Sequence, residues 1–170
     1  MLKTFIKSQL KKFGAKYDYD TSYIAEMLDV SLGLFMNYNK FVKVAGYRKK
    51  SPKDIYYVAR IAALKVADCG PCLQLTVNFA KEAGVQNSIL EAAVRNPEQL
   101  NPEQLLSYDF GYAVASNADN HDVLSEEFEK KFGKEILMEV SFAVATAIVY
   151  PTLKRGLRHA KSCRLVKISV

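Results

Sequence analysis

Apolar residues recur along almost the whole chain at intervals of three and four positions, the spacing of one face of an α-helix. No segment alternates apolar and polar residues with a period of two, so the pattern predicts no β-strand. The expected helices cover residues 1–13, 19–29, 32–44, 52–67, 87–94, 102–118, 125–132 and 134–159, with a further helix between Asp68 and Gly84. The pattern therefore predicts an all-α fold, in which helices pack on helices.

Glycine, serine and proline mark where several of these helices begin and end. Gly14, Gly84 and Gly133 each follow an amphipathic segment, as expected of residues that terminate helices. Ser51 precedes Pro52, and this pair predicts an N-cap followed by the first helical residue. The helix that follows is apolar on most sides, so we expect it to lie at the centre of the fold.

A sequence of five residues occurs twice in succession, as 96–100 and 101–105. Each copy begins with asparagine and proline, which suit an N-cap and a first helical position. Two consecutive helix starts predict a short turn and then a long helix from Pro102 to about Ala118. Two copies of five residues are too few for a repeat architecture.

The last predicted helix is the most apolar part of the chain. Its longest apolar stretch is 136–150, and the part around 140–149 is expected to be buried on more than one side, as in an oligomer. It is shorter than the roughly 20 apolar residues needed to cross a bilayer, so no transmembrane segment is expected. Lysines interrupt the first helix, which argues against a secretory signal. Pro151 is expected to kink or split the last helix.

Composition and length are those of a globular protein. The 170 residues are 49% hydrophobic and 25% charged, and this length favours a single domain, 1–170. The three cysteines show no stapling pattern, which is typical of a reducing compartment, and we expect a cytoplasmic protein.

The net charge of +6 is concentrated near both ends of the chain. Basic residues gather in the segments 3–16 and 154–167, whereas the middle is close to neutral. A basic rim can attract an acidic partner, but no stacking motif or other nucleic-acid-binding signature accompanies it. We expect a solvated surface and no nucleic-acid partner.

The residues that carry chemistry are Cys69 and Cys72, which are separated by glycine and proline where a new helix starts. This spacing brings both sulfurs to one helix end, where unpaired backbone N–H groups and the positive end of the helix dipole stabilise a thiolate. A thiolate there attacks a peroxide or a disulfide, and the second thiol resolves the intermediate. The pair is therefore the candidate catalytic site of a thiol-dependent oxidoreductase.

Two other interpretations of the pair remain open. A zinc site would need two further ligands from Cys163, His121 and His159, but no second pair has the spacing of zinc ligands. The two cysteines could instead be buried structural residues that are inert as redox groups. A thioredoxin fold is excluded because it needs strands around the motif. We expect neither a bound metal nor a cofactor.

The sequence from Val58 to Cys72 resembles the core of the carboxymuconolactone decarboxylase and alkylhydroperoxidase D family. The break at Gly84, the short helix 87–94 and the Asn-Pro-Glu helix start extend this resemblance to about residues 51–118, and the rest of the chain, including the helices in 1–45, resembles the family only loosely. The resemblance implies a helical bundle of the alkylhydroperoxidase D-like type, assembled as a homotrimer or homohexamer. It also implies that paired cysteines reduce peroxides or disulfides, with electrons from a dithiol donor such as a lipoylated or thioredoxin-like protein.

The chain departs from this family at the proton relay. Thiol-active members carry a glutamate twelve residues before the first cysteine and a histidine four residues after the second, and here these positions are Tyr57 and Thr76. Both can form hydrogen bonds, but neither is a good base near pH 7. Asp68, adjacent to the pair, and His121, an imidazole that could fold onto it, are the other relay candidates.

The resemblance suggests that Cys72 is the activated sulfur and Cys69 the more accessible partner. The intact cysteine motif with an altered relay favours a disulfide reductase or weak peroxidase over an efficient peroxidase. Tyr57 and Thr76 also favour an alternative, a non-enzymatic oligomer on the same scaffold that binds a small apolar ligand. Lactone decarboxylation is less expected, because decarboxylases of the family usually lack the paired cysteines.

Overall fold

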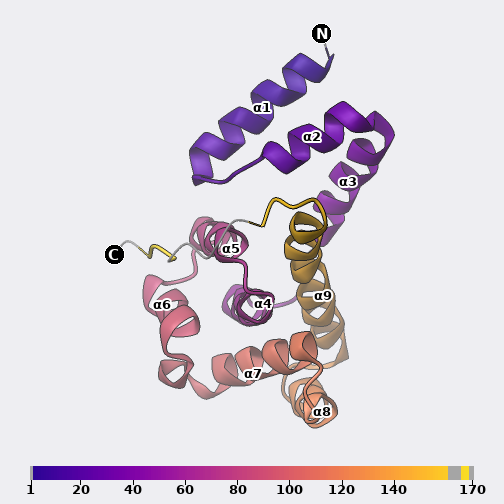
Figure 1. Ribbon diagram of the computed structural model, residues 1–170. Coiled ribbons are helices and arrows are strands. Elements are labelled where there is room, and N and C mark those ends of the chain that lie inside the picture. Colours follow the sequence, from indigo (N-terminus) through magenta and orange to yellow (C-terminus); the bar gives the residue numbers. More distant parts are fainter. Residues whose placement is uncertain (1, 161–165, 169–170) are drawn as a thin grey trace.

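The computed structural model describes residues 2–160 and 166–168. This part of the chain is built of α-helices with one short 3-10 turn and contains no strand, which confirms the expected all-helical fold (Figure 1). The helices are α1 (Leu2–Tyr17), α2 (Ser22–Val30), α3 (Leu32–Ala45), α4 (Lys53–Val66), α5 (Gly70–Glu82), α6 (Asn87–Arg95), α7 (Pro102–Ser116), α8 (His121–Phe132) and α9 (Lys134–Gly156), with the turn η1 (Pro97–Gln99) before α7.

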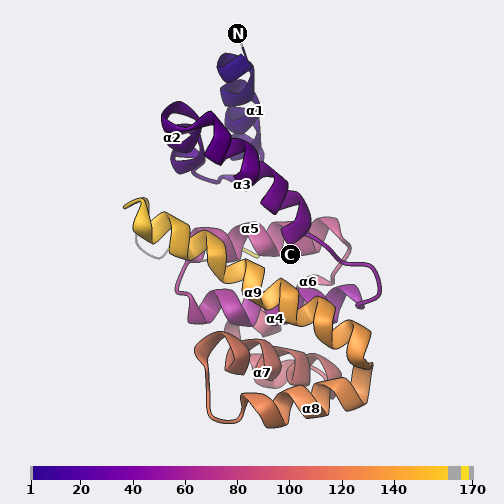
Figure 2. The ribbon, with the colours of Figure 1, turned by 90° about the vertical axis from the view of Figure 1, so that its right-hand side faces the viewer.

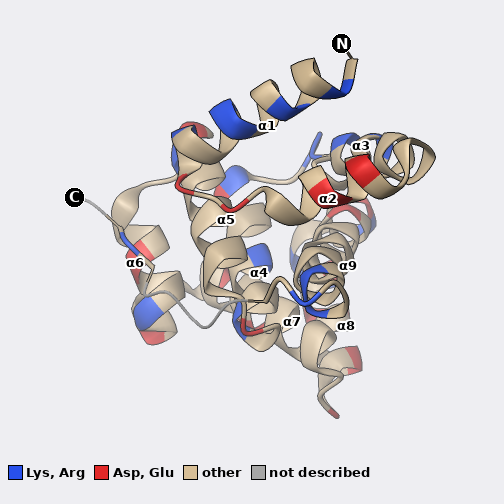
Figure 3. Cartoon of the chain, turned by 45° about the horizontal axis from the view of Figure 1, so that its top comes forward, with Lys and Arg blue, Asp and Glu red and all other residues tan. Residues whose placement is uncertain are grey.

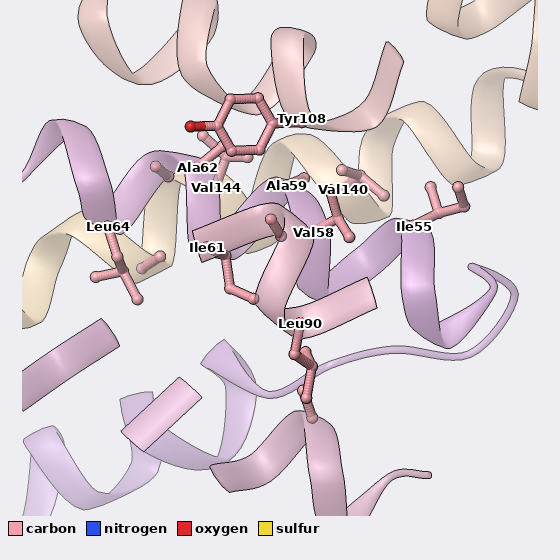
Figure 4. Close-up of a cluster of buried hydrophobic side chains, with 14 of the residues drawn as sticks. Ile55, Val58, Ala59, Ile61, Ala62, Leu64, Leu90, Tyr108, Val140 and Val144 are labelled. Atoms are coloured by element: carbon pink, nitrogen blue, oxygen red, sulfur yellow. The ribbon is translucent and has the colours of Figure 1, made fainter. Parts of the chain in front are cut away.

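Helix α4 lies at the centre of the main bundle, as its apolar sequence predicts. Figure 1 shows it end-on, with α5, α6, α7 and α9 around it. The core cluster around α4 draws Leu90 from α6, Tyr108 from α7, and Val140 and Val144 from α9 (Figure 4). Helix α7 approaches α4 most closely at Gly111, where a Cβ atom would lie 2.5 Å from the carbonyl oxygen of Ala59. No side chain larger than hydrogen fits at this crossing.

Helices α1, α2 and α3 form a second hydrophobic cluster that lies over α5 (Figure 2). Its buried residues are Tyr19, Tyr23, Ile24, Met27, Leu28 and Phe35. Leu75 of α5 and Leu153 of α9 pack against it from the main bundle. The amino end of α5 and the carboxyl end of α9 therefore lie at the seam between the two clusters.

The basic residues of α1 help to hold this helix in place. Figure 3 shows its lysines along the helix. Lys7 pairs with Asp29 of α2 at 2.7 Å, and Lys16 pairs with Glu82 of α5 at 2.7 Å. These pairs are exposed, so each stabilises the fold only slightly. They nevertheless account for two of the positive charges at this end of the chain.

Most predicted helix ends are correct, but α1 does not stop at Gly14. The helix continues to Tyr17, and Asp18 then takes a left-handed conformation with φ of 49°. A Cβ atom on Gly14 would lie 2.8 Å from the carbonyl oxygen of Tyr19, while the Gly14 carbonyl accepts the Tyr19 N–H at 3.0 Å. The glycine is therefore needed for the close return of the chain and not for ending the helix.

Pro151 neither splits α9 nor ends it. The helix is continuous from Lys134 to Gly156, and Pro151 is itself buried within it. A proline inside a helix removes a backbone hydrogen bond. Here Ala147 and Lys154, one turn to either side, are buried, so tertiary packing holds the helix together across the proline.

The continuous α9 is longer than the apolar stretch that the sequence suggested. Among the described residues, α9 is the one helix whose length and apolar composition would allow it to span a bilayer. It packs against α4, α7 and α8, and its buried positions include the charged residues Glu139 and Lys154. A single helix of this kind is weak evidence for a membrane span, because the core helices of globular bundles pass the same test.

Ser51 does not serve as the N-cap of α4. The capping position belongs to Pro52, and the buried Ser51 donates its hydroxyl to Glu139 of α9 at 2.7 Å. The backbone N–H groups of Lys49, Lys50 and Ser51 also point at this carboxylate, at 2.9–3.1 Å. The carboxylate of Glu139, which is distant in sequence, thus engages Ser51 in place of a local cap and links the loop before α4 to α9 by hydrogen bonds.

Candidate functional site

The cysteine pair lies at the amino end of α5, as the sequence predicts. Cys69 occupies the N-cap position, with Gly70 and Pro71 as the first helical residues and Cys72 in the first turn. Both cysteines are free thiols. Cys69 is half-buried, whereas only 4% of Cys72 is exposed. Cys69 is therefore the sulfur that a substrate can reach.

The pKa values of the two thiols are shifted in opposite directions. The pKa of Cys69 is lowered to about 6, mainly by the hydrogen bond from the Cys72 thiol and, to a smaller extent, by the Cys72 backbone N–H and the charges of Lys154 and Arg155, all of which act against burial. The same hydrogen bond, together with burial and the Cys69 charge, raises the pKa of Cys72. Cys69 is the more accessible sulfur, as expected, but the direction of the two pKa shifts favours Cys69 and not Cys72 as the activated sulfur.

Lys154, from the last turns of α9, is a buried cation beside this pair. Only 3% of the residue is exposed, and its ammonium group lies 4.6 Å from the ring centre of Tyr19 and 5.3 Å from that of Tyr23. Within the described residues it forms no ion pair with a carboxylate. A buried charge needs a compensating partner, and the aromatic faces compensate it only in part. The thiolate of Cys69 is a negative charge that can compensate the ammonium group of Lys154.

Two buried tyrosines, Tyr19 and Tyr23, and the partly buried Tyr38 extend from the cysteines into the second cluster. The Tyr19 hydroxyl is hydrogen-bonded to Cys72. It lies 3.2 Å from the Tyr23 hydroxyl, which lies 3.0 Å from that of Tyr38 in α3. Burial raises the pKa of all three phenols, so they remain protonated hydrogen-bond donors at neutral pH. Tyr19 can therefore donate to Cys72 whenever that sulfur is a thiolate.

Arg155 brings a second positive charge to the same turn. Its guanidinium donates to the carbonyl oxygen of Ala67 at 2.8 Å, and Ala67 is the C-cap of α4, two residues before Cys69. In contrast to Lys154, the arginine is exposed. The end of α9 thus contributes one buried and one exposed cation to the surroundings of Cys69.

Tyr57 is not brought to the cysteines. Lys53, one turn before it, donates to the carbonyl of Gly84 beyond the far end of α5. Helices α4 and α5 form an antiparallel hairpin, so the start of α4 lies beside the end of α5 and away from Cys69. The charges that act on the Tyr57 phenol include that of Glu82, at this same far end.

Of the other relay candidates, Thr76 and Asp68 lie near the pair and His121 does not. Thr76 is buried one turn after Cys72 on the same face of α5. Asp68 lies in the turn before Cys69 with φ of 48°, and it is not the N-cap of α5. His121 begins α8, on the side of α4 opposite to α5 (Figure 2), and its imidazole lies 3.0 Å from Asp122.

The residues considered as zinc ligands do not gather at one place. His159 lies at the end of α9 and contacts Glu26 at 2.6 Å and the Ser22 hydroxyl at 3.1 Å. Cys163 falls outside the described residues. Within the described part of the chain, no group of three or more histidine, cysteine or acidic side chains is placed to hold a metal ion.

Sequence reasoning found both sulfurs but missed the residues that surround them. Lys154, Arg155 and the tyrosines are distant from the cysteines in the sequence, and no motif links them. The only signals were the abundance of tyrosine and the basic residues directly after the apolar stretch of α9. Neither signal specifies a position in space.

Comparisons with known proteins identify no relative of this chain. No family model, no curated protein and no solved structure matches the chain. The resemblance to the carboxymuconolactone decarboxylase and alkylhydroperoxidase D family is accordingly carried by residues 51–118 of the sequence alone.

Proposed function

We propose that the protein is a thiol-dependent oxidoreductase of the alkylhydroperoxidase D-like type, which reduces disulfides and, more weakly, peroxides. The observation that carries this proposal is the environment of Cys69. This half-buried thiol lies at a helix amino terminus, its pKa is lowered to about 6, and a second thiol is hydrogen-bonded to it. Near neutral pH most of Cys69 is then a thiolate, the form that reacts with disulfides.

Reduction of a disulfide proceeds in two exchanges. The Cys69 thiolate attacks one sulfur of the substrate, the substrate S–S bond breaks, and the first substrate thiolate leaves and takes a proton from water. Cys72 then loses its proton and attacks the Cys69 sulfur, which releases the second substrate thiol and forms a Cys69–Cys72 disulfide. The substrate has gained two electrons, and a dithiol donor restores the protein by the same exchange in reverse.

With a peroxide, the Cys69 thiolate attacks one oxygen and the O–O bond breaks, so that Cys69 becomes a sulfenic acid and the alkoxide or hydroxide that leaves takes a proton from water to give an alcohol or water. Cys72 then condenses with the sulfenic acid, forming the same disulfide and releasing water. In this structure neither Tyr57 nor His121 lies where it could protonate the leaving oxygen, which is why we place disulfides ahead of peroxides as substrates.

The partners belong to the same proposal. We infer a lipoylated or thioredoxin-like dithiol protein as the electron donor, because a dithiol can reduce the Cys69–Cys72 disulfide without leaving a mixed disulfide behind. We further infer a homotrimer or homohexamer in the cytoplasm. Exposed apolar residues on the outer face of α9, among them Met138 and Phe142, are consistent with assembly.

Thiolate absorbance of the reduced protein, followed across pH, tests the proposal. The wild-type protein should show a thiol that titrates near pH 6. Cys69→Ser should abolish this titration. Cys72→Ala should keep a titrating thiol, shifted upward because the hydrogen bond from Cys72 is lost, and it should accumulate a mixed disulfide with the substrate. If every thiol titrates only above its ordinary value of about 8.5, the activated-thiol proposal is wrong. The alternative of a non-enzymatic, ligand-binding oligomer would then be the better interpretation.

A further inference from the structure

The two cations at the end of α9 differ in what can reach them. Lys154 is 3% exposed, so it acts on the Cys69 sulfur through the protein interior and no substrate can contact it. Arg155, the next residue, is exposed. Consecutive residues of one helix thus place one buried and one exposed positive charge near the sulfur.

The position of Arg155 is fixed relative to Cys69. Its Nη1 donates to the Ala67 carbonyl at 2.8 Å, and its Nη2 lies 3.4 Å from the Thr152 hydroxyl. A guanidinium has five N–H donors, so these contacts leave others that can bind an anion. The anchor at Ala67 also limits the conformational entropy that the arginine would lose on binding.

We propose that Arg155 makes the site selective for disulfides that carry a carboxylate close to the sulfur–sulfur bond. This inference rests on the proposed function and specifies its substrate class. A guanidinium pairs well with a carboxylate because the two planar groups can form parallel hydrogen bonds. The pairing would hold the disulfide over Cys69, and the arginine is unchanged by the two exchanges.

Asp68 is the charge that opposes this selection. It is exposed in the turn directly before Cys69 and would repel an anionic substrate. Among the described residues, Lys154 and Arg155 both place positive charge near Cys69, which favours the binding of an anion there.

The experiment compares three small disulfides of similar size: the dianion 3,3′-dithiodipropionate, the neutral bis(2-hydroxyethyl) disulfide and the dication cystamine. The measured quantity is the second-order rate constant for oxidation of the reduced protein at low salt. We expect the dianion to react fastest and the dication slowest. Arg155→Met should lower the ratio of these two rate constants by roughly tenfold, the lower end of the range for electrostatic steering. Arg155→Lys should retain part of the ratio.

The ratio separates substrate selection from thiol activation, because any change in the pKa of Cys69 alters all three rate constants together. Lys130→Met, an exposed change on the remote α8, is the matched control and should leave the ratio unchanged. Equal rate constants for the three disulfides, or a ratio that Arg155→Met does not change, would overturn the inference and leave the proposed function standing. If no disulfide reacts in a way that requires Cys69, both the function and the inference are wrong.

Discussion

Helix α9 carries a buried charge near each of its ends, and the two are compensated in different ways. Glu139, 6% exposed, accepts hydrogen bonds from three backbone N–H groups and from the Ser51 hydroxyl. Lys154, 3% exposed, has the faces of two tyrosine rings and, within the described residues, no carboxylate partner. A buried charge with all its hydrogen bonds formed stabilises the fold. A buried charge that lacks a full set of partners is instead suited to a site where an opposite charge forms during the reaction.

The electrostatics of the two ends follow from this difference. Burial alone would raise the pKa of Glu139, but the hydrogen bonds from Ser51, Lys50 and Lys49 lower it to about 2. At the other end, Lys154 contributes to the low pKa of Cys69, although the Cys72 hydrogen bond contributes most. One end of α9 therefore stabilises the fold, and the other end tunes a reactive sulfur.

The largest effect is expected from Glu139→Gln. The substitution removes the buried charge and leaves backbone N–H groups poorly paired, so the free energy of unfolding at pH 7 should fall by roughly 3 kcal/mol. Because the pKa of Glu139 is depressed in the folded state, its stabilisation is complete above the ordinary pKa of a glutamate. It is lost as pH falls from there toward 2, and the difference between variant and wild type should shrink over the same range.

Urea denaturation at several pH values measures this difference. Glu135→Gln, an exposed substitution in the first turn of the same helix, is the control and should change stability by less than about 0.5 kcal/mol. Equal losses for the two variants would mean that the hydrogen bonds to Glu139 do not stabilise the fold.

Lys154→Met should change the reactivity of Cys69 and leave stability nearly unchanged, in contrast to Glu139→Gln. Without the ammonium group the pKa of Cys69 should rise by roughly one unit, which lowers the thiolate fraction near neutral pH. Stability should change little, because methionine fills a similar volume without a charge to desolvate. Thiolate absorbance and urea denaturation, measured on this variant and on Glu139→Gln, sharpen the comparison. A variant that loses stability but keeps an unchanged Cys69 pKa would show that Lys154 is a structural residue.

Tyr19→Phe should have the smallest effect. It removes the hydroxyl that is hydrogen-bonded to Cys72 and keeps the aromatic ring near Lys154. We expect a loss of about 1 kcal/mol of stability and a several-fold slower closure of the Cys69–Cys72 disulfide, because the Cys72 thiolate loses a donor. Stopped-flow mixing of the reduced protein with a disulfide reports closure. Tyr38→Phe, at the far end of the hydroxyl chain, is the control, and equal slowing by both variants would contradict a direct role for Tyr19.

The helix ends show where local sequence is a sufficient guide. Gly84 and Gly133 follow their helices with φ of 80° and 86°, and Asn101 forms a capping box with Gln104, as their residue types predict. These features depend on contacts within one turn. Gly14 and Ser51 were misassigned because distant groups, the returning chain at Tyr19 and the carboxylate of Glu139, determine what they do.

The same distinction applies to the candidate site. The sequence by itself determined the all-helical fold and the placement of Cys69 and Cys72 at the start of a helix, because helix periodicity and capping act over a few residues. Only the tertiary structure decided which side chains meet the sulfurs. The antiparallel hairpin of α4 and α5 carries Tyr57 away from them, while α9 returns to the hairpin turn with Lys154 and Arg155. No local pattern encodes such a meeting, since it depends on how whole helices pack around α4.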